Sequence, residues 1–315
     1  PMAFMPPTGG LWVPLDRCRP ILGVSASDIR SLLGVSTRQF RGVKKSRGWS
    51  EHYLEVAGRL TKFICVPRLL AAAAVGPVEN LLQGLAPPPR AVPGSAAPGL
   101  VELYAYQSTC VDALLAGCFA PARVAAGTAM GYLNLPAGQG KTLVGVEVAR
   151  RVGTRAVFIA PREQIEMQWR AGLEDHIAGA VVCIAGSTPP ARRAAAIAAA
   201  DFVVMTPNLA LAMPPEFWAG FGLAVVDEAH MLCSQVWQSV LSGFTCARAL
   251  GLSATTADRP DGMDPIAYWH LGPPVHAVEL PGYDAVAVEF FGRARLLDVR
   301  GDGISGVLRG RSHAE

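Results

Sequence analysis

Short apolar runs alternate with helix-like stretches from about residue 100 onward, and this alternation restricts the fold more than any other feature of the chain. The apolar runs are MGYLNL, RAVFIA, AVVCIA, DFVVMT, LAVVD and ALGLSA, and the helical candidates between them are KTLVGVEVARRV, REQIEMQWRAGL, PARRAAAIAAA and MLCSQVWQSVLSGF. Strands that alternate with helices form a parallel sheet covered on both faces, and near-continuous apolar strands indicate burial. The sequence therefore predicts an α/β fold with a parallel sheet sandwiched by helices.

Composition divides the chain into parts. Residues 1–70 contain 11 Lys or Arg and 4 Asp or Glu, whereas residues 71–315 contain 17 and 21, so the N-terminal part is basic. The segment APPPRAVPGSAAPG is rich in proline and glycine and predicts an extended linker. We therefore expect a basic accessory region over residues 1–85, a linker over 86–99, an α/β domain over 100–280, and the start of a linker or of a truncated second domain over 281–315.

The stretch RQFRGVKKSRGW, residues 38–49, concentrates basic side chains without an acid and also holds Phe40 and Trp49. Its basic residues are Arg38, Arg41, Lys44, Lys45 and Arg47. Such a patch can bind nucleic-acid phosphates while the aromatic rings stack on bases. A solvated loop explains the same composition equally well, so the role of this region stays open.

Membrane, secreted and disulfide-rich classes are disfavoured. No apolar run reaches the roughly 18–20 residues of a membrane-spanning helix, because Arg68 interrupts FICVPRLLAAAAV. The start, PMAFMPPTGG, lacks the basic and apolar regions of a signal peptide. The 7 cysteines include no CxxC pair, which argues against a disulfide framework and a structural zinc site. We expect a soluble intracellular protein with no membrane partner.

The stretch LPAGQGKT, residues 135–142, lies between a predicted strand and a predicted helix. Two glycines allow backbone N–H groups to face one centre at the helix N-terminus, where phosphate oxygens bind. Lys141 can then reach the β- and γ-phosphates, and Thr142 can offer its hydroxyl to Mg²⁺. We predict that ATP is bound by Pro136, Ala137, Gly138, Gln139, Gly140, Lys141 and Thr142. The general pattern has glycine where this chain has Leu135, so an ordinary glycine turn before a helix is the alternative.

The stretch LAVVDEAHML ends an apolar strand in two acids. Ligands of open α/β sheets bind at the carboxyl ends of the strands. There Asp227 can hold Mg²⁺ through water, and Glu228 can polarise an attacking water. Buried acids at a strand end are costly without a cation. Together with the phosphate loop, these acids predict nucleotide hydrolysis.

Residues 100–280 resemble superfamily 2 helicases and translocases of the DEAH-box kind through several spaced motifs. LPAGQGKT is similar to motif I, IAPREQIEMQW to motif Ia, VVMTPNLAL to motif Ib, VVDEAHML to motif II, GLSATTADRPDGM to motif III, and LYAYQ to the adenine-reading glutamine motif. The resemblance implies a RecA-like P-loop NTPase domain that uses ATP and Mg²⁺ and acts on nucleic acid.

The resemblance also implies roles for residues outside the phosphate loop. Gln107 would read adenine, and His230 would act with the catalytic residues Lys141, Asp227 and Glu228 by coupling the nucleotide site to motif III. The coupling residues of motif III would be Ser253, Ala254 and Thr255. Alternatively, Ser253 and Thr255 only cap a turn.

A nucleic-acid backbone would be contacted by Pro161, Arg162, Thr206 and Pro207, because an arginine and a hydroxyl give sequence-independent contacts. Considered alone, the TPN sequence at residues 206–208 is only a turn signal. Gln168 and Trp169 are expected to pack the motif Ia helix rather than to touch substrate.

The LPxGxGK form at Leu135 resembles the branch that contains XPB-like repair helicases and the helicases of large nucleocytoplasmic DNA viruses. KFICVPRLL before the core and RPDGMD after motif III are more similar to the viral group. Tyr104 departs from that branch, which often has arginine before the YQ pair. The viral resemblance implies a place in the nucleus or cytoplasm of a host cell, or in a virion.

A superfamily 2 motor closes ATP between two RecA-like domains, and the second supplies arginines that stabilise the transferred phosphoryl group. After residue 280 the sequence shows no second set of βα units and no QxxGRxxR-like motif. We expect the second domain to lie in a longer chain or in another chain, and DNA, with RNA as the alternative, to be the partner. A nucleic-acid-binding scaffold with a degenerate motor and a restriction-type translocase subunit are the competing classes.

Overall fold

The computed structural model describes residues 10–22, 25–39, 42–47, 50–56, 59–67, 69, 90–92, 102–234, 237–255, 263–277, 285–291 and 293–299. The chain divides into two compact units, Pro1–Ala277 and Val278–Glu315. All the predicted helicase motifs belong to the first unit. None of the helices in these described ranges is both long and apolar enough to cross a membrane.

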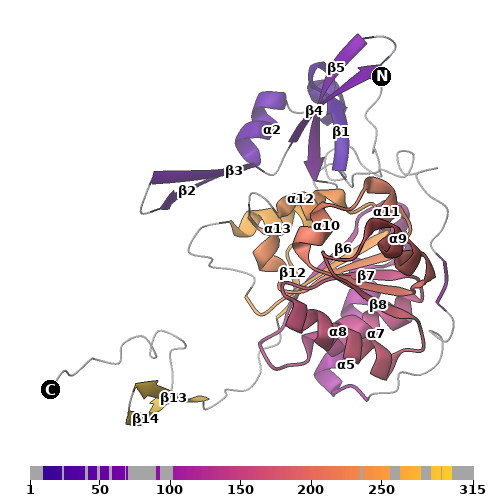
Figure 1. Ribbon diagram of the computed structural model, residues 1–315. Helices are drawn as coiled ribbons and strands as arrows, with labels where there is room; N and C mark the ends of the chain where they lie inside the picture. The colour runs from indigo at the N-terminus through magenta and orange to yellow at the C-terminus, as the bar shows by residue number, and fades with distance from the viewer. Residues whose placement is uncertain are drawn as a thin grey trace. The chain divides into compact units, whose positions relative to one another are not determined.

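A seven-stranded parallel sheet forms the centre of the α/β domain (Figure 1). In spatial order its strands are β12 (Pro274–Ala277), β6 (Ala129–Asn134), β11 (Arg248–Ser253), β10 (Leu223–Val226), β7 (Ala156–Ile159), β9 (Phe202–Met205) and β8 (Val181–Ile184). Every residue of β7, β9 and β10 is buried, as central strands between two helical layers should be. The predicted parallel α/β sheet is confirmed.

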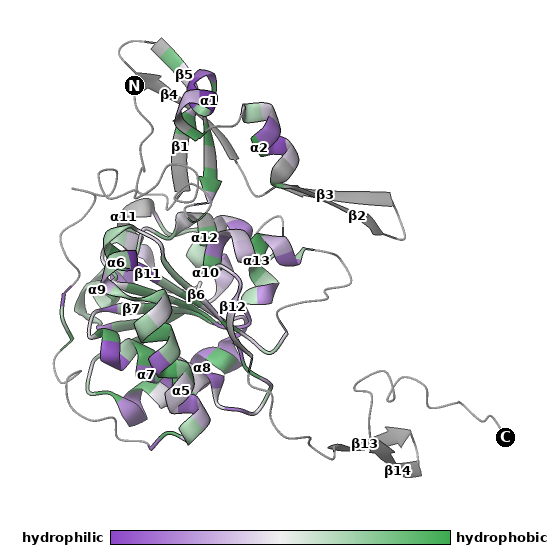
Figure 2. Cartoon of the chain, turned by 180° about the vertical axis from the view of Figure 1, so that it is seen from behind, coloured by the Kyte–Doolittle hydropathy of each residue, from purple (hydrophilic) through white to green (hydrophobic). Residues whose placement is uncertain are grey.

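Helices cover both faces of this sheet (Figure 1). On one face lie α5 (Ala105–Ala113), α7 (Lys141–Val152) and α8 (Glu163–His176), and on the other lie α10 (Pro207–Leu211), α12 (Gln238–Gly243) and α13 (Asp264–Leu271). The remaining helical segments are η2 (Leu114–Cys118), α6 (Pro121–Ala125), α9 (Pro190–Ala199), α11 (Pro215–Ala219) and η3 (Ala229–Leu232). Figure 2 shows the apolar residues concentrated along the strands and the inner faces of the helices, so the core lies between the sheet and its two layers.

One predicted helix is wrong. The stretch MLCSQVWQSVLSGF does not form a single helix, because η3 ends at Leu232 and α12 begins only at Gln238. Ser234 lies between them, and its hydroxyl accepts a hydrogen bond from the Trp237 N–H at 3.1 Å. A serine that bonds nearby backbone groups offers the chain an alternative to a continuous helix.

The described part of the N-terminal region contains a three-stranded antiparallel sheet of β1 (Gly10–Pro14), β5 (Arg59–Pro67) and β4 (Ser50–Val56), in that order. It also contains η1 (Leu15–Arg17), α1 (Cys18–Leu22) and α2 (Ala26–Leu32). Ser25 and Asp28 close a capping box at the start of α2, which satisfies amides that the first helical turn leaves open.

The basic stretch lies largely in a hairpin. Strands β2 (Gly34–Gln39) and β3 (Gly42–Arg47) pair antiparallel, with Thr37 opposite Lys44 and Ser36 opposite Lys45. Arg38, Lys44, Lys45 and Arg47 are therefore strand residues and not loop residues. Phe40, Arg41 and Trp49 lie outside the described residues.

Part of the predicted linker is attached to the α/β domain. Ala91 forms an isolated bridge with Thr154, and the Val92 N–H donates to the Gly153 carbonyl at 3.0 Å. The Arg90 guanidinium pairs with the Asp201 carboxylate at 2.6 Å.

In the second unit the described residues form one antiparallel hairpin, β13 (Ala285–Phe291) with β14 (Arg293–Val299). Residues 301–315, the last part of the predicted linker or truncated second domain, lie outside the described residues.

Candidate nucleotide-binding site

Five neighbouring strands of the sheet each lead into one predicted motif. Motif I follows β6, motif III ends β11, motif II follows β10, motif Ia follows β7 and motif Ib follows β9. The carboxyl ends of parallel strands meet at one edge of a sheet, which is where open α/β folds bind ligands. The topology therefore gathers at a single edge the motifs that the sequence separates by more than 100 residues.

The loop after β6 turns tightly into α7. Gly138 and Gly140 have φ values of +77° and +74°, a region in which residues with a Cβ are strained. A Cβ on Gly138 would meet no heavy atom within 4 Å, so the loop faces open space at this position. The first intrahelical bond of α7 runs from the Val144 N–H to the Gly140 carbonyl at 3.0 Å. The amides before it lack an intrahelical acceptor, which is the arrangement that binds phosphate oxygens.

Leu135 directly follows β6 and precedes the glycine turn. Its side chain is fully buried, and its N–H donates to the Ser253 carbonyl at 3.0 Å, one step beyond the paired residues Asn134 and Ser253. The chain turns only after this residue, at the two glycines with positive φ. The missing first glycine of the general pattern therefore leaves the geometry of the loop intact.

Lys141 and the two acids of motif II face the same space. The Nζ atom of Lys141 lies 3.8 Å from Oε1 of Glu228. Both oxygens of Asp227 accept hydrogen bonds, Oδ2 from the Trp169 indole at 3.0 Å and Oδ1 from the Glu228 backbone N–H at 2.9 Å. Burial raises the pKa of the Asp227 carboxyl, and the bond from Trp169 opposes that rise. An acid held this way is suited to a cation, which would supply the missing positive charge.

Glu228 has a strained backbone. Its φ is +47°, and within the described ranges it is the one non-glycine residue with positive φ. Such strain costs of order 1–3 kcal/mol and persists where the surroundings hold it, often at functional sites. His230 Nδ1 lies 3.3 Å from Oε2 of Glu228. A hydrogen bond from His230 lowers the pKa of Glu228, burial opposes this, and Lys141 adds to it. Glu228 therefore remains an ionised acceptor, as a general base must.

His230 also reaches motif III. Its Nδ1 lies 2.8 Å from the Ser253 hydroxyl, which donates to the Thr255 carbonyl at 2.7 Å. Since the hydroxyl proton is used there, Nδ1 of His230 is the donor, and its one proton is shared between Ser253 Oγ at 2.8 Å and Glu228 Oε2 at 3.3 Å. The Thr255 N–H also donates to Ser253 Oγ at 3.1 Å. Ser253 therefore both caps a turn and contacts His230 of motif II. Ala254, between Ser253 and Thr255 in the sequence, is half-buried.

Gln107 is buried against the phosphate loop. Its Nε2 donates to the Gln139 carbonyl at 3.2 Å, its Oε1 accepts from the Tyr104 N–H at 3.0 Å, and the Tyr106 hydroxyl donates to the same Gln139 carbonyl at 3.2 Å. The ring of Tyr104 is 71% exposed and stacks on Tyr106 with centroids 5.9 Å apart. The Gln107 side chain thus supports the loop, and its second amide N–H is the group that a base could engage.

The residues expected to contact nucleic acid lie at neighbouring strand ends. Strands β7 and β9 pair up to Ile159 and Met205, so Pro161 and Arg162 follow one strand where Thr206 follows the other. Arg162 is exposed, and Pro161 and Thr206 are half-buried. Pro207 is buried at the start of α10, where it holds the preceding Thr206 in place.

Sequence reasoning missed two groups of contacts. One is the bond from Trp169 to Asp227, since Trp169 was expected only to pack. The other surrounds Glu147 of α7, whose carboxylate contacts Arg150 at 2.7 Å, Arg151 at 2.6 Å and His176 of α8 at 2.7 Å. Burial opposes ionisation, but these hydrogen bonds lower the pKa of Glu147 to about 2. The sequence did contain a signal for these contacts, because Arg150 and Arg151 follow Glu147 by three and four residues, the spacing at which side chains meet on a helix.

The residues present fit a magnesium-bound nucleotide. The α7 N-terminus offers amides for phosphate, Lys141 offers a cation, and the half-buried Thr142 hydroxyl and the Asp227 carboxylate are hard oxygen ligands of the kind that Mg²⁺ takes. In the described part of the chain, no cluster of three or more His, Cys, Asp or Glu side chains offers a protein-only metal site. Mg²⁺ sites of nucleotide-binding proteins commonly combine one or two carboxylates with substrate phosphates.

Comparisons with known proteins agree with this geometry. Residues 100–258 match the ResIII family model, described as the type III restriction enzyme res subunit. A candidate ATP-dependent RNA helicase of African swine fever virus, QP509L, is 33% identical over 147 residues, which are 47% of this chain and 29% of the relative. A candidate helicase of Frog virus 3, 055L, is 33% identical over 136 residues, 41% of this chain and 30% of the relative.

Among solved structures, the UvsW helicase of bacteriophage T4 superposes with a TM-score of 0.52 at 17% sequence identity, over 85% of this chain and 96% of that chain. At that identity the match concerns the fold. The chain covers less than a third of the length of the two viral relatives. Because the family model spans just over half of the residues, and its match contains motifs I, Ia, Ib and II, the chain belongs to the ResIII family of superfamily 2 helicases.

Proposed function

We propose that this chain is the ATP-binding motor half of a nucleic-acid-dependent ATPase that acts on DNA, in viral transcription, replication or repair. One observation carries the proposal. Lys141, at the N-terminus of α7, faces Glu228 at 3.8 Å, with the buried Asp227 beside it. A phosphate-binding helix end, a cation and two acids at one sheet edge are the parts that phosphoryl transfer to water requires.

Each side chain has a separable task in this mechanism. The α7 amides and Lys141 bind and orient the phosphates, while Thr142 and Asp227 would hold the cation. When bound, Mg²⁺ would neutralise the charge that develops on the phosphate oxygens. Glu228, which His230 keeps ionised, orients the attacking water and accepts its proton. His230 couples the nucleotide state of this site to the position of Ser253 in motif III through their 2.8 Å contact.

Nucleic acid is proposed to bind at the strand ends that carry Arg162 and Thr206. An exposed arginine and a hydroxyl at neighbouring strand ends give contacts to phosphates without reading sequence. The African swine fever virus relative is named for RNA, whereas the resemblance to the branch that contains XPB-like repair helicases favours DNA, so both nucleic acids belong in the test. The β2–β3 hairpin, with its basic residues, is proposed as an accessory contact.

A second RecA-like domain is proposed to complete the motor, in the same full-length chain or in another chain. The described residues of the α/β domain supply one face of the nucleotide site. Arginines from a second domain would stabilise the transition state, a contribution of about 10³- to 10⁵-fold in rate. We therefore expect this chain alone to bind nucleotide tightly and to hydrolyse it slowly.

A restriction-type translocase subunit is the second candidate function, because the family description names such an enzyme. The two candidates share the motor and differ in what accompanies it, so a nuclease domain in the full-length gene product would favour the second. A scaffold with a degenerate motor is disfavoured, because Lys141, Asp227 and Glu228 are all present and face one another.

The test is fluorescent ATP binding and ATP hydrolysis by the chain with DNA, RNA or neither. Lys141→Ala should weaken Mg-ATP binding at least tenfold, whereas Arg170→Ala should not change it, because Arg170 is exposed on α8 and pairs with Glu174 of the same helix. Normal ATP binding by Lys141→Ala would contradict the phosphate site. Fast, DNA-stimulated hydrolysis by the chain alone would contradict the requirement for a second domain.

A further inference from the structure

Helix α8 lies beside both residues expected to hold magnesium and bonds to one of them. Trp169 lies in the middle of α8 and donates from its indole Nε1–H to Oδ2 of Asp227 at 3.0 Å. One turn later, a Cβ placed on Gly172 would lie 3.6 Å from Cγ2 of Thr142. The same helix face therefore binds the ligand from motif II and passes close to the ligand from motif I.

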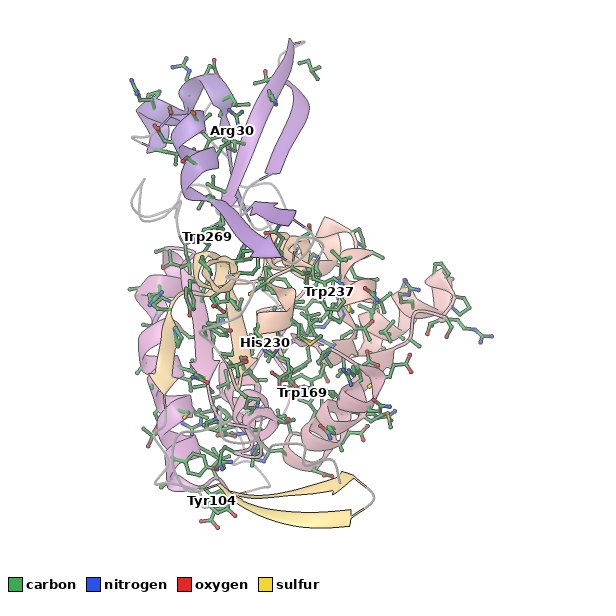
Figure 3. The ribbon with its side chains drawn as sticks, turned by 90° about the vertical axis from the view of Figure 1, so that its left-hand side faces the viewer. Arg30, Tyr104, Trp169, His230, Trp237 and Trp269 are labelled. Carbon is green, nitrogen blue, oxygen red and sulfur yellow. The ribbon has the colours of Figure 1, made fainter. Side chains whose placement is uncertain are left out.

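The position of the Trp169 ring is tightly fixed. The side chain is 1% exposed, and its ring lies 4.9 Å from the ring of Phe158 on β7. A Cβ on Gly145 of α7 would lie only 2.6 Å from Cη2 of Trp169, so this glycine provides the space that the indole occupies. Trp169 and His230, both labelled in Figure 3, lie toward the middle of the α/β domain, whereas Tyr104 lies at its edge. A buried ring held between such close neighbours has a fixed direction for its N–H.

The bond from Trp169 leaves Asp227 able to bind a cation. An indole N–H only donates, so Trp169 cannot itself compete for a metal ion. The carboxylate has about four acceptor positions on its two oxygens, and the described contacts use one on each oxygen, from Trp169 and from the Glu228 N–H. With both oxygens held, the carboxylate cannot rotate freely about its terminal bond, and its remaining acceptor positions keep one direction.

We propose that Trp169 is a positioning residue that orients the Asp227 carboxylate for Mg²⁺, through its indole N–H and not through packing alone. This proposal rests on the proposed function, since it concerns the same nucleotide site. It gives the buried tryptophan of motif Ia a role in metal binding. Outer groups that orient a metal ligand typically affect metal affinity or activity by about 10- to 100-fold.

The experiment measures binding of a fluorescent ATP analogue to the full chain at a series of Mg²⁺ concentrations and in EDTA. Trp169→Phe removes the N–H and keeps an aromatic ring. We expect the Mg²⁺ concentration for half-maximal binding to rise by about 10- to 100-fold, with binding in EDTA changed less than threefold. The matched control is Trp218→Phe, because Trp218 is equally buried, at 2% exposure, but packs against Phe217 and Phe244.

A double-mutant cycle separates positioning from structural damage. If Trp169 acts through Asp227, then Trp169→Phe should have little further effect on Mg²⁺-dependent binding in an Asp227→Asn background. Should Trp169→Phe fail to fold by circular dichroism, Gly145→Ala provides a second route, because the added methyl group must displace the indole without deleting it. That variant should also raise the Mg²⁺ requirement.

The outcomes distinguish this proposal from the proposed function. An unchanged Mg²⁺ requirement in Trp169→Phe, an equal change in Trp218→Phe, or a fully additive effect in the Asp227→Asn background would overturn the positioning role and leave ATP binding intact. Failure of the wild-type chain to bind the nucleotide at any Mg²⁺ concentration would overturn the proposed function itself.

Discussion

Replacement of Glu166 by glutamine should stabilise this protein above neutral pH. Glu166 lies on α8 with 6% of its surface exposed, and its Oε1 has no hydrogen-bond partner among the described residues. Burial raises the pKa of this carboxyl from 4.5 to about 7, and the charge of Glu163 adds to the rise. The folded state therefore keeps a proton that the unfolded state releases as the pH rises.

The sign and size of the effect follow from this difference in pKa. A carboxyl with a raised pKa in the folded state contributes stability below pH 4.5 that is lost as the pH rises through about 7. The loss is about 1.4 kcal/mol for each pKa unit, which gives about 3 kcal/mol for Glu166. Glutamine has nearly the same shape and no charge, so Glu166→Gln should avoid this loss.

The assay is urea unfolding of the wild type and Glu166→Gln at pH 5 and pH 8. The free energy of unfolding of the variant should exceed that of the wild type by about 2–3 kcal/mol at pH 8 and by little at pH 5. Glu174→Gln is the control on the same helix, since the Glu174–Arg170 pair is 46% exposed on each side and should contribute less than about 1 kcal/mol at either pH. An equal difference between wild type and Glu166→Gln at both pH values would refute the reasoning.

Three further changes test other parts of the structure. Gly140→Ala should lower the melting temperature and weaken nucleotide binding more than Gly138→Ala, because both positions have positive φ but only the Gly140 Cβ would clash with Gln107 Nε2. Glu147→Gln should lower the free energy of unfolding at pH 7 by about 3–5 kcal/mol, since it removes the buried carboxylate that Arg150 and Arg151 contact. The wild type itself should lose the Glu147 contribution as the pH falls from 4.5 toward 2, so the two proteins should converge in urea unfolding at low pH. His230→Ala should raise the pKa of Glu228 and move the acid limb of single-turnover ATP hydrolysis to higher pH, because the His230 bond is the largest cause of the lowered pKa.

The sequence predicted the α/β domain well where local signals and buried strands agree. Helix α7 was predicted with its observed bounds, and the structure shows why, since Gly140 and Gly153 flank it with φ values of +74° and +69°. Six apolar runs became six strands of the sheet, because a continuous apolar segment of that length has few other ways to be buried. The strand order then placed the five motifs at one edge.

Long-range side-chain contacts could not be predicted in the same way. Trp169 and Asp227 are 58 residues apart, and their contact depends on the rotation of α8 about its axis, which apolar periodicity fixes only coarsely. The buried Glu147 network depends likewise on His176 of a different helix. The N-terminal hairpin was missed because β2 and β3 are polar strands. A sequence pattern identifies a strand mainly when one of its faces is buried and therefore apolar.

Leu135 shows how a departure from a motif can follow from strand register. A phosphate loop needs glycine where φ is positive, and here those positions are Gly138 and Gly140. Leu135 instead directly follows β6 and donates its N–H to the carbonyl of Ser253, whose hydroxyl contacts His230 at 2.8 Å. A glycine could make the same backbone bond, but it would leave a cavity where a fully buried leucine now packs, at a cost of several kcal/mol. The leucine therefore joins the backbone of motif I to motif III while it anchors the end of the strand in the core, and this explains how the loop keeps its geometry without the first glycine.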